Sequence, residues 1–117
     1  MPGIHLILFG ATGLVGSGTL HVALADPDVE RILVVGRSST GRSHPKLKEL
    51  LLPDLFDLSA GEADLTGYNA CIFAIGVTAV GKSEADYSHL TYDLTLGCAQ
   101  TLLRLNPSLS FAYVCGA

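Results

Sequence analysis

Hydrophobic residues along this chain gather in short runs that glycine, proline and polar segments separate. Five runs are nearly continuous in their apolar character, as is typical of strands buried on both faces of a parallel sheet. These runs are Ile4–Phe9, Arg31–Gly36, Glu49–Leu52, Ala70–Gly76 and Ser110–Cys115.

Two longer segments carry helical signals. The first follows the initial strand and is expected to end near Ala25, where Asp26–Pro27 stops it. The second begins at Ser83 or Ser88 and runs to Leu105, with apolar residues at every fourth position. Strand and helix therefore alternate, which predicts an α/β fold with a doubly wound parallel sheet of strand order 3-2-1-4-5. A length of 117 residues predicts one domain, 1–117.

Some local expectations follow from the same pattern. In the first helix, the residues expected to face the sheet are Leu14, Val15, Val22 and Ala23, and Gly18 is expected to allow close packing. The polar segment 40–48 is expected to form a surface loop or a short helix.

Three glycines follow the first strand at a G-x-x-G-x-x-G spacing. Gly10 lets the chain turn sharply, Gly13 lets backbone N–H groups approach a ligand, and Gly16 lets the first helical turn pack against the sheet. The start of the helix carries unpaired N–H groups and a partial positive charge, which suit a pyrophosphate. This strand–turn–helix arrangement predicts a dinucleotide site. The alternative is a tight turn that binds no ligand.

The end of the second strand bears on the kind of dinucleotide. NAD sites place an acidic residue about 20 positions after the glycine turn, whereas this chain has Arg37 and Ser38. A guanidinium pairs with a 2′-phosphate and stacks on adenine, so the sequence favours NADP(H) over NAD(H). Alternatively, Arg37 is a solvated residue after a strand. Asp54 and Leu55, just past the third strand, are placed to bind the adenine amino group and ring.

Composition narrows the class of partner. The chain is 49% hydrophobic and 15% charged, and its net charge of −4 argues against nucleic acid. No apolar run reaches the ~18 residues of a membrane span, and no signal peptide precedes the first strand. Neither the histidines nor Cys71, Cys98 and Cys115 show metal spacing, and the cysteines show no disulfide pattern. The cysteine usage favours a cytoplasmic location.

A second phosphate-binding pattern competes with the glycine turn. Gly76–Ser83 matches G-x-x-x-x-G-K-[ST] between a strand and a helix, with Lys82 for terminal phosphates and Ser83 for magnesium. Glu84 and Asp86 would repel polyphosphate from the first turn of that helix. No later strand ends in the aspartate that a nucleoside triphosphatase uses for its metal. We therefore rank this pattern below the first glycine turn.

The run Gly10–Gly16 resembles atypical and extended short-chain dehydrogenases/reductases, and more narrowly their nucleoside-diphosphate-sugar-epimerase-like and Tat-interacting-protein-like branch. The resemblance covers nearly the whole chain and implies a Rossmann-like, NAD(P)-binding domain. The positions that it implies for the cofactor are Gly10, Thr12, Gly13, Leu14, Val15 and Gly16 around the phosphates, Arg37 and Ser38 at the 2′-phosphate, Asp54 and Leu55 at the adenine, and Ala74 and Gly76 along the ribose.

The chain also departs from this superfamily. Its reductases use a serine at the end of strand 5 and a Tyr-x-x-x-Lys pair on the next helix, with the tyrosine as general acid/base. Here Cys115 stands at the serine position, and the sequence contains no such pair after it. The fold is therefore expected to be truncated after strand 5, either as part of a longer enzyme or as a naturally short chain. Its uncovered fifth strand predicts a homo-oligomer.

Three functional hypotheses remain open. The first is an NADP(H)-binding domain of a reductase or epimerase-like protein whose catalytic residues are incomplete in this chain. The second is a non-catalytic module that senses NADPH or serves as a subunit. The third is a non-redox isomerase or cyclase for a small metabolite, with Cys115 as acid or nucleophile. For Cys115 itself we favour a buried strand-end thiol without a chemical role.

Overall fold

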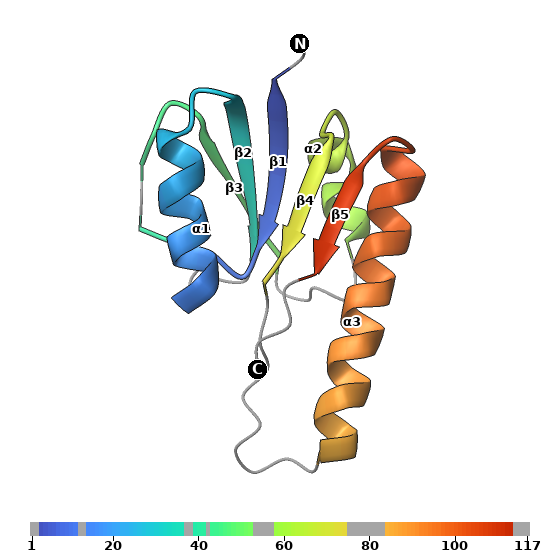
Figure 1. The fold of residues 1–117 in the computed structure, drawn as a ribbon. Coiled ribbons are helices and arrows are strands. Elements are labelled where there is room, and N and C mark those ends of the chain that lie inside the picture. Colours follow the sequence, from blue (N-terminus) through green and yellow to red (C-terminus); the bar gives the residue numbers. More distant parts are fainter. Residues whose placement is uncertain are drawn as a thin grey trace.

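The computed structural model describes residues 3–11, 14–36, 39–41, 43–52, 58–74 and 84–113. Within them, five parallel strands form one sheet (Figure 1). The strands are β1 (Ile4–Phe9), β2 (Val29–Gly36), β3 (Leu47–Leu51), β4 (Ala70–Phe73) and β5 (Ser110–Tyr113). Their order, β3-β2-β1-β4-β5, confirms the predicted doubly wound α/β topology.

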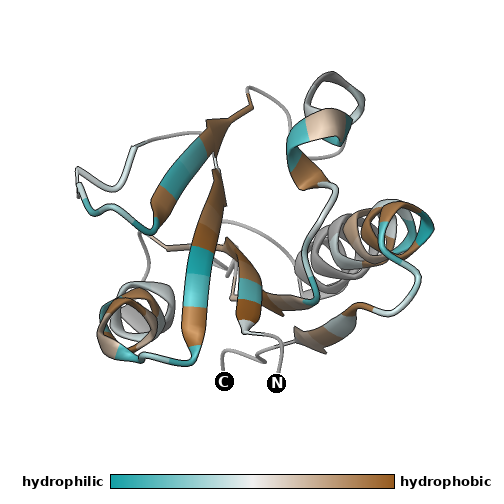
Figure 2. Cartoon of the chain, turned by 90° about the horizontal axis from the view of Figure 1, so that it is seen from above, coloured by the Kyte–Doolittle hydropathy of each residue, from teal (hydrophilic) through white to brown (hydrophobic). Residues whose placement is uncertain are grey.

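The helices lie on both faces of the sheet. Helix α1 (Leu14–Ala25) covers one face, and the short helices η1 (Ser59–Gly61) and α2 (Glu62–Leu65) lie with α3 (Glu84–Leu105) on the other. Figure 2, which views the sheet from above, shows the same separation. Both long helices end where the sequence predicts, at Ala25 and Leu105.

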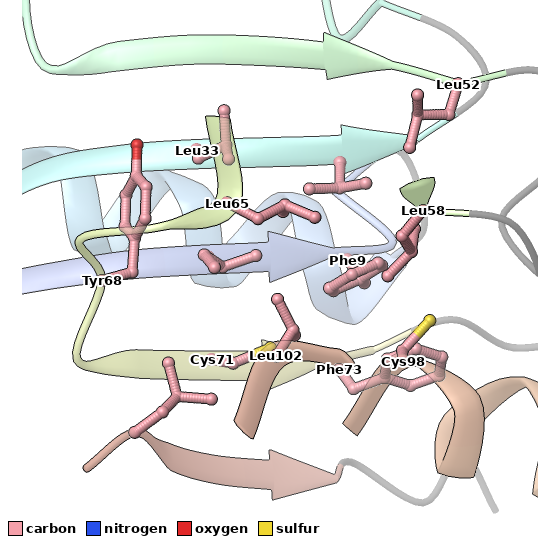
Figure 3. Packing of buried hydrophobic residues seen from close by; sticks show 13 residues of the cluster. Phe9, Leu33, Leu52, Leu58, Leu65, Tyr68, Cys71, Phe73, Cys98 and Leu102 are labelled. Atoms are coloured by element: carbon pink, nitrogen blue, oxygen red, sulfur yellow. The ribbon is translucent and has the colours of Figure 1, made fainter. Parts of the chain in front are cut away.

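Two apolar clusters hold the layers together because successive side chains of a strand point to opposite faces. Under α1, Leu20 packs with Leu8 and Val34. Under α2 and α3, the cluster is larger and aromatic (Figure 3). There the ring centroids of Phe9 and Phe73 lie 5.2 Å apart, a distance typical of packed aromatic pairs.

The face of α1 differs from the expectation at two positions. Val22 is 66% exposed, whereas Leu20 is fully buried. The buried positions Gly16, Leu20 and Ala23 follow the helical period, whereas Val22 lines the open cavity over the sheet beside α1. Gly18 also has open space around it, so it is not a close-packing position.

The described part of the segment 40–46 is a loop, as expected, which is anchored through Lys46, whereas residues 47 and 48 belong to β3. Its ammonium group donates to the backbone carbonyls of Asp26 and Val29, each at 2.9 Å. The backbone carbonyl of Lys46 accepts a hydrogen bond from Ile32 at 2.8 Å. Strand β3 therefore begins at Leu47, two residues earlier than the apolar run predicts, and Lys46 joins it to the turn between α1 and β2.

Candidate dinucleotide-binding site

The turn after β1 brings the chain directly from the sheet into α1. Gly10 has a φ angle of 85°, in the left-handed region that glycine adopts without steric cost. Ala11 beside it is buried, and α1 begins at Leu14. The chain thus passes from strand to helix within four residues, as the glycine spacing predicts.

Gly16 lies against the backbone of this turn. A β-carbon on Gly16 would lie 1.8 Å from the carbonyl oxygen of Gly10 and 2.5 Å from its carbonyl carbon. These are backbone atoms and cannot rotate away as a flexible side chain does, so only glycine fits without a shift of the chain. The structure confirms the packing role expected of Gly16, and it seats the first turn of α1 on the end of β1.

The turn lies at the switch point of the sheet. Strand β1 is central, with β2 on one side and β4 on the other. The backbone N–H of Ala74 donates to the carbonyl oxygen of Phe9 at 3.0 Å, which holds the carboxyl ends of β4 and β1 together. The start of α1 lies at this same end of the sheet (Figure 1). In open α/β sheets, ligands bind outside the carboxyl ends of strands at such a point.

A carboxylate that the sequence did not single out anchors the loop after β2. One oxygen of Glu49 accepts from the hydroxyl of Ser39 at 2.7 Å, and the other accepts from the backbone N–H of Thr40 at 2.7 Å. The Thr40 N–H, and then the Ser39 hydroxyl, hold the pKa of Glu49 below its ordinary value of 4.5. In the sequence, the only sign of this role is that Glu49 is a single carboxylate at the start of an otherwise apolar predicted strand.

The ends of β2 and β3 also lie together. The backbone N–H of Leu52 donates to the carbonyl oxygen of Gly36 at 2.8 Å. Gly36 and Leu52 therefore lie side by side at the carboxyl ends of β2 and β3.

Several expected site positions lie outside the described residues. For Leu14 and Val15 the structure gives helical backbone without a description of the side chains. The competing pattern Gly76–Ser83 also lies outside, although α3 does begin directly after it at Glu84. The remaining expected positions outside the described residues are Thr12, Gly13, Arg37, Ser38, Asp54, Leu55, Gly76 and Cys115.

Two other cysteines lie in the core beneath α3. Cys71 and Cys98 are each 1% exposed. Burial raises the pKa of Cys98 to about 12 and raises the pKa of Cys71 further. Both thiols are therefore protonated at neutral pH, as is typical of buried cysteines that serve in packing.

Among the residues that the structure describes, no three histidine, cysteine or acidic side chains gather closely enough to hold a metal ion. Nor does any helix in this part of the chain have the length and apolar character to cross a bilayer.

The sheet order, the switch point and the glycine turn define the architecture of a Rossmann-type α/β domain. Uronate dehydrogenase from Agrobacterium tumefaciens has a similar structure, with a TM-score of 0.72 and 19% identity over 99% of this chain and 42% of that one. NADPH-bound carbonyl reductase from chicken fatty liver gives a TM-score of 0.67 and 20% identity over 90% of this chain and 49% of that one. A short-chain dehydrogenase/reductase from Saccharomyces cerevisiae gives a TM-score of 0.66 and 16% identity over 97% of this chain and 54% of that one.

At these identities the likeness shows the fold, which is that of short-chain dehydrogenases/reductases. The chain spans only about two fifths to just over half of these proteins. No protein-family model matches the sequence. No curated protein matches it either.

Proposed function

We propose that this chain binds NADP(H) at the carboxyl ends of β1 and β4. The observation that carries the proposal is the contact between Gly16 and Gly10, because it seats the start of a 12-residue helix at the switch point. The unpaired N–H groups and positive end of α1 suit a pyrophosphate there. Structures of the same fold support the assignment, since one is described as NADPH-bound and another as complexed with NAD.

The preference for NADP(H) rests on Arg37 and Ser38, which directly follow Gly36 at the end of β2. In this proposal Arg37 pairs with the 2′-phosphate and its planar guanidinium lies on the adenine. Glu49 fixes the loop that follows, through Ser39 and Thr40. Asp54 and Leu55 complete the adenine end, and Ala74 and Gly76 lie along the ribose.

The wider activity that we propose is that of a reductase or epimerase-like protein, to which this domain contributes the cofactor site. The cofactor supplies hydride chemistry when bound. In this proposal, the residues of this chain bind and orient the cofactor. They do not include the Tyr-x-x-x-Lys pair that the superfamily's reductases use for proton transfer, because the given sequence contains no such pair. The alternative of a non-catalytic subunit that senses NADPH would use the same binding site. A non-redox isomerase or cyclase would require a reactive Cys115.

Calorimetric titrations with NADPH, NADH and Mg·ATP test the proposal. We expect NADPH to bind more tightly than NADH, and Arg37→Ala to weaken NADPH binding about ten-fold, which corresponds to ~1.4 kcal/mol. NADH affinity should fall less than NADPH affinity in that variant, because NADH has the adenine ring but lacks the 2′-phosphate. Arg104→Ala is the matched control, because it removes an exposed arginine that pairs with Glu62 on α2.

Two outcomes contradict the assignment. Binding of Mg·ATP alone would favour Lys82 and the pattern Gly76–Ser83. The absence of binding by all three nucleotides would leave the glycine turn as a structural feature and favour a non-redox role. For that role, the decisive variant is Cys115→Ala, which should abolish turnover of a small metabolite while the fold is retained.

We further propose that the chain forms homo-oligomers through the side of the sheet that ends in β5. Strand β5 is at the sheet edge. Beside it, a largely apolar cavity of about 580 Å³ extends over the face shared with α1, and Ala70, Ile72 and Ala112 line its floor. Parallel sheets are normally covered on both faces, and an exposed edge favours strand pairing.

A further inference from the structure

A second pocket, of about 260 Å³, lies on the other face of the sheet between β2, β3 and α2. Its walls include Arg31 near the start of β2, Lys48 near the start of β3 and Tyr68 just before β4. These residues lie at the amino ends of the strands. Arg31 is five residues from Gly36, so at 3.3 Å per residue Arg31 lies roughly 17 Å along the strand from the proposed cofactor edge.

Tyr68 gives the pocket an unsatisfied donor. The residue is only 7% exposed, and Figure 3 shows its side chain lying across β2 with the hydroxyl directed toward β3. Among the described residues this hydroxyl has no hydrogen-bond partner. The hydroxyl therefore lies at the wall of the pocket, where it can donate to a ligand that accepts a hydrogen bond.

Two cations accompany this hydroxyl. The guanidinium of Arg31 lies 4.9 Å from the centre of the Tyr68 ring and donates to the carbonyl oxygen of Gly67 at 2.8 Å. These contacts fix its position beside the pocket. Lys48 is exposed and makes no ion pair with a described residue. Burial raises the pKa of Tyr68, so the phenol is a donor at neutral pH.

The acidic residues limit what the pocket can accept. The carboxylate of Glu49 is already engaged by Ser39 and Thr40. Asp64 on α2 also lines the pocket, and its exposed carboxylate would repel an anion that offers no donor. The ligand therefore needs a negative group for the two cations and a hydroxyl for Asp64.

We propose that this pocket binds a small oxyanion that carries a hydroxyl group, as hydrogen phosphate and 2-hydroxy carboxylates do. Arg31 and Lys48 face the negative charge, the Tyr68 hydroxyl donates to an oxyanion oxygen, and Asp64 accepts from the ligand's hydroxyl. The pocket is smaller than the 300–1,000 Å³ typical of ligand sites for larger molecules. None of its lining residues is among those proposed to bind the dinucleotide, so this inference does not depend on the proposed cofactor binding.

The test is a titration of the full chain with inorganic phosphate and, separately, with L-malate, followed by amide NMR. We expect saturable shifts at Arg31, Lys48 and Tyr68, and weaker binding at higher NaCl concentration. Tyr68→Phe keeps the ring and removes only the hydroxyl, so it should weaken binding about ten-fold. Lys48→Gln should weaken binding several-fold, whereas the matched control Arg104→Gln should leave it unchanged.

Saturation by phosphate alone or by malate alone would support the site and identify the oxyanion. The proposal is overturned if neither probe gives saturable shifts at these residues, or if both bind equally well to wild type and Tyr68→Phe. The same spectra show whether Tyr68→Phe is folded. In the absence of a ligand its melting temperature should stay close to that of the wild type, because the substitution keeps the ring and its contact with Arg31.

Discussion

Gly16 of α1 and Gly10 of the preceding turn are in direct backbone contact, closely enough that a β-carbon on Gly16 would lie 1.8 Å from the Gly10 carbonyl oxygen. The contact joins the first helix to the end of the first strand. It fixes both the position of α1 on the sheet and the direction of its positive end. Stability and the proposed cofactor binding therefore depend on the same pair of residues.

Replacement of Gly16 by alanine should destabilise the protein by about 3 kcal/mol or more, because the new methyl group meets backbone that has to move. Urea denaturation followed by circular dichroism measures the change. The matched control is Gly18→Ala in the same helix, where a β-carbon meets nothing within 4 Å. This control should stabilise the protein by up to about 1 kcal/mol. Equal effects of the two substitutions would contradict the packing role of Gly16.

Substitution of Asn106 should lower the stability of the protein as much as substitution of a buried apolar residue. Its side chain, 8% exposed, accepts hydrogen bonds from the backbone N–H groups of Gly67 and Tyr68 at 2.9 and 3.2 Å. It also donates to the carbonyl oxygen of Leu65 at 2.9 Å. Asn106→Leu keeps the size and leaves these backbone groups unpaired, at a cost of about 3 kcal/mol. Thermal and urea unfolding measure it, with the exposed Gln100→Leu as control.

The loop after β2 should loosen in acid. Hydrogen bonds from Thr40 and Ser39 lower the folded-state pKa of Glu49 below 4.5. A lowered folded pKa means that the interaction stabilises the loop above pH 4.5 and is lost as the pH falls through the folded value. Amide NMR of Thr40 should therefore titrate with a midpoint below 4.5. In Glu49→Gln this titration should disappear, and a midpoint above 4.5 would contradict the hydrogen-bonded geometry.

Oligomerisation should respond to charge on β5. Ala112 is exposed and lines the cavity beside the edge strand. Light scattering of the wild type should give a mass above the 12.2 kDa of one chain. Ala112→Lys should shift the population toward monomer, whereas Gln100→Lys on the exposed face of α3 should not. A monomeric wild type at micromolar concentration would remove the basis for this proposal.

The order of the elements could be predicted because it follows from local signals. Strand β1 is a continuous apolar run, and the glycines after it mark the turn into α1, so both appear without knowledge of the fold. The parallel order of the sheet then follows from the alternation of strand and helix. The helix ends at Ala25 and Leu105 were predictable for the same reason, since a proline follows two residues after each of them and acts on its immediate neighbours.

The site was predictable only in part. The packing role of Gly16 follows from its spacing in the motif. The anchor at Glu49 does not, because its partners lie nine and ten residues away and meet it only when β2 and β3 pair. Val22 was misplaced because α1 has apolar residues on several sides, and hydrophobicity alone cannot choose among them.

By itself, the sequence determined the fold class, the glycine turn and the edge of the sheet at which we propose the cofactor site, all of which depend on residues close together in the chain. Only the tertiary structure decided what the isolated polar side chains do. Lys46 donates hydrogen bonds to two backbone carbonyls of a distant turn. Asn106 accepts hydrogen bonds from two backbone N–H groups of the segment that leads into β4. Tyr68 directs its hydroxyl into a pocket formed by β2, β3 and α2. Such roles depend on which unpaired groups the folded chain brings within hydrogen-bond distance, and no local pattern encodes that.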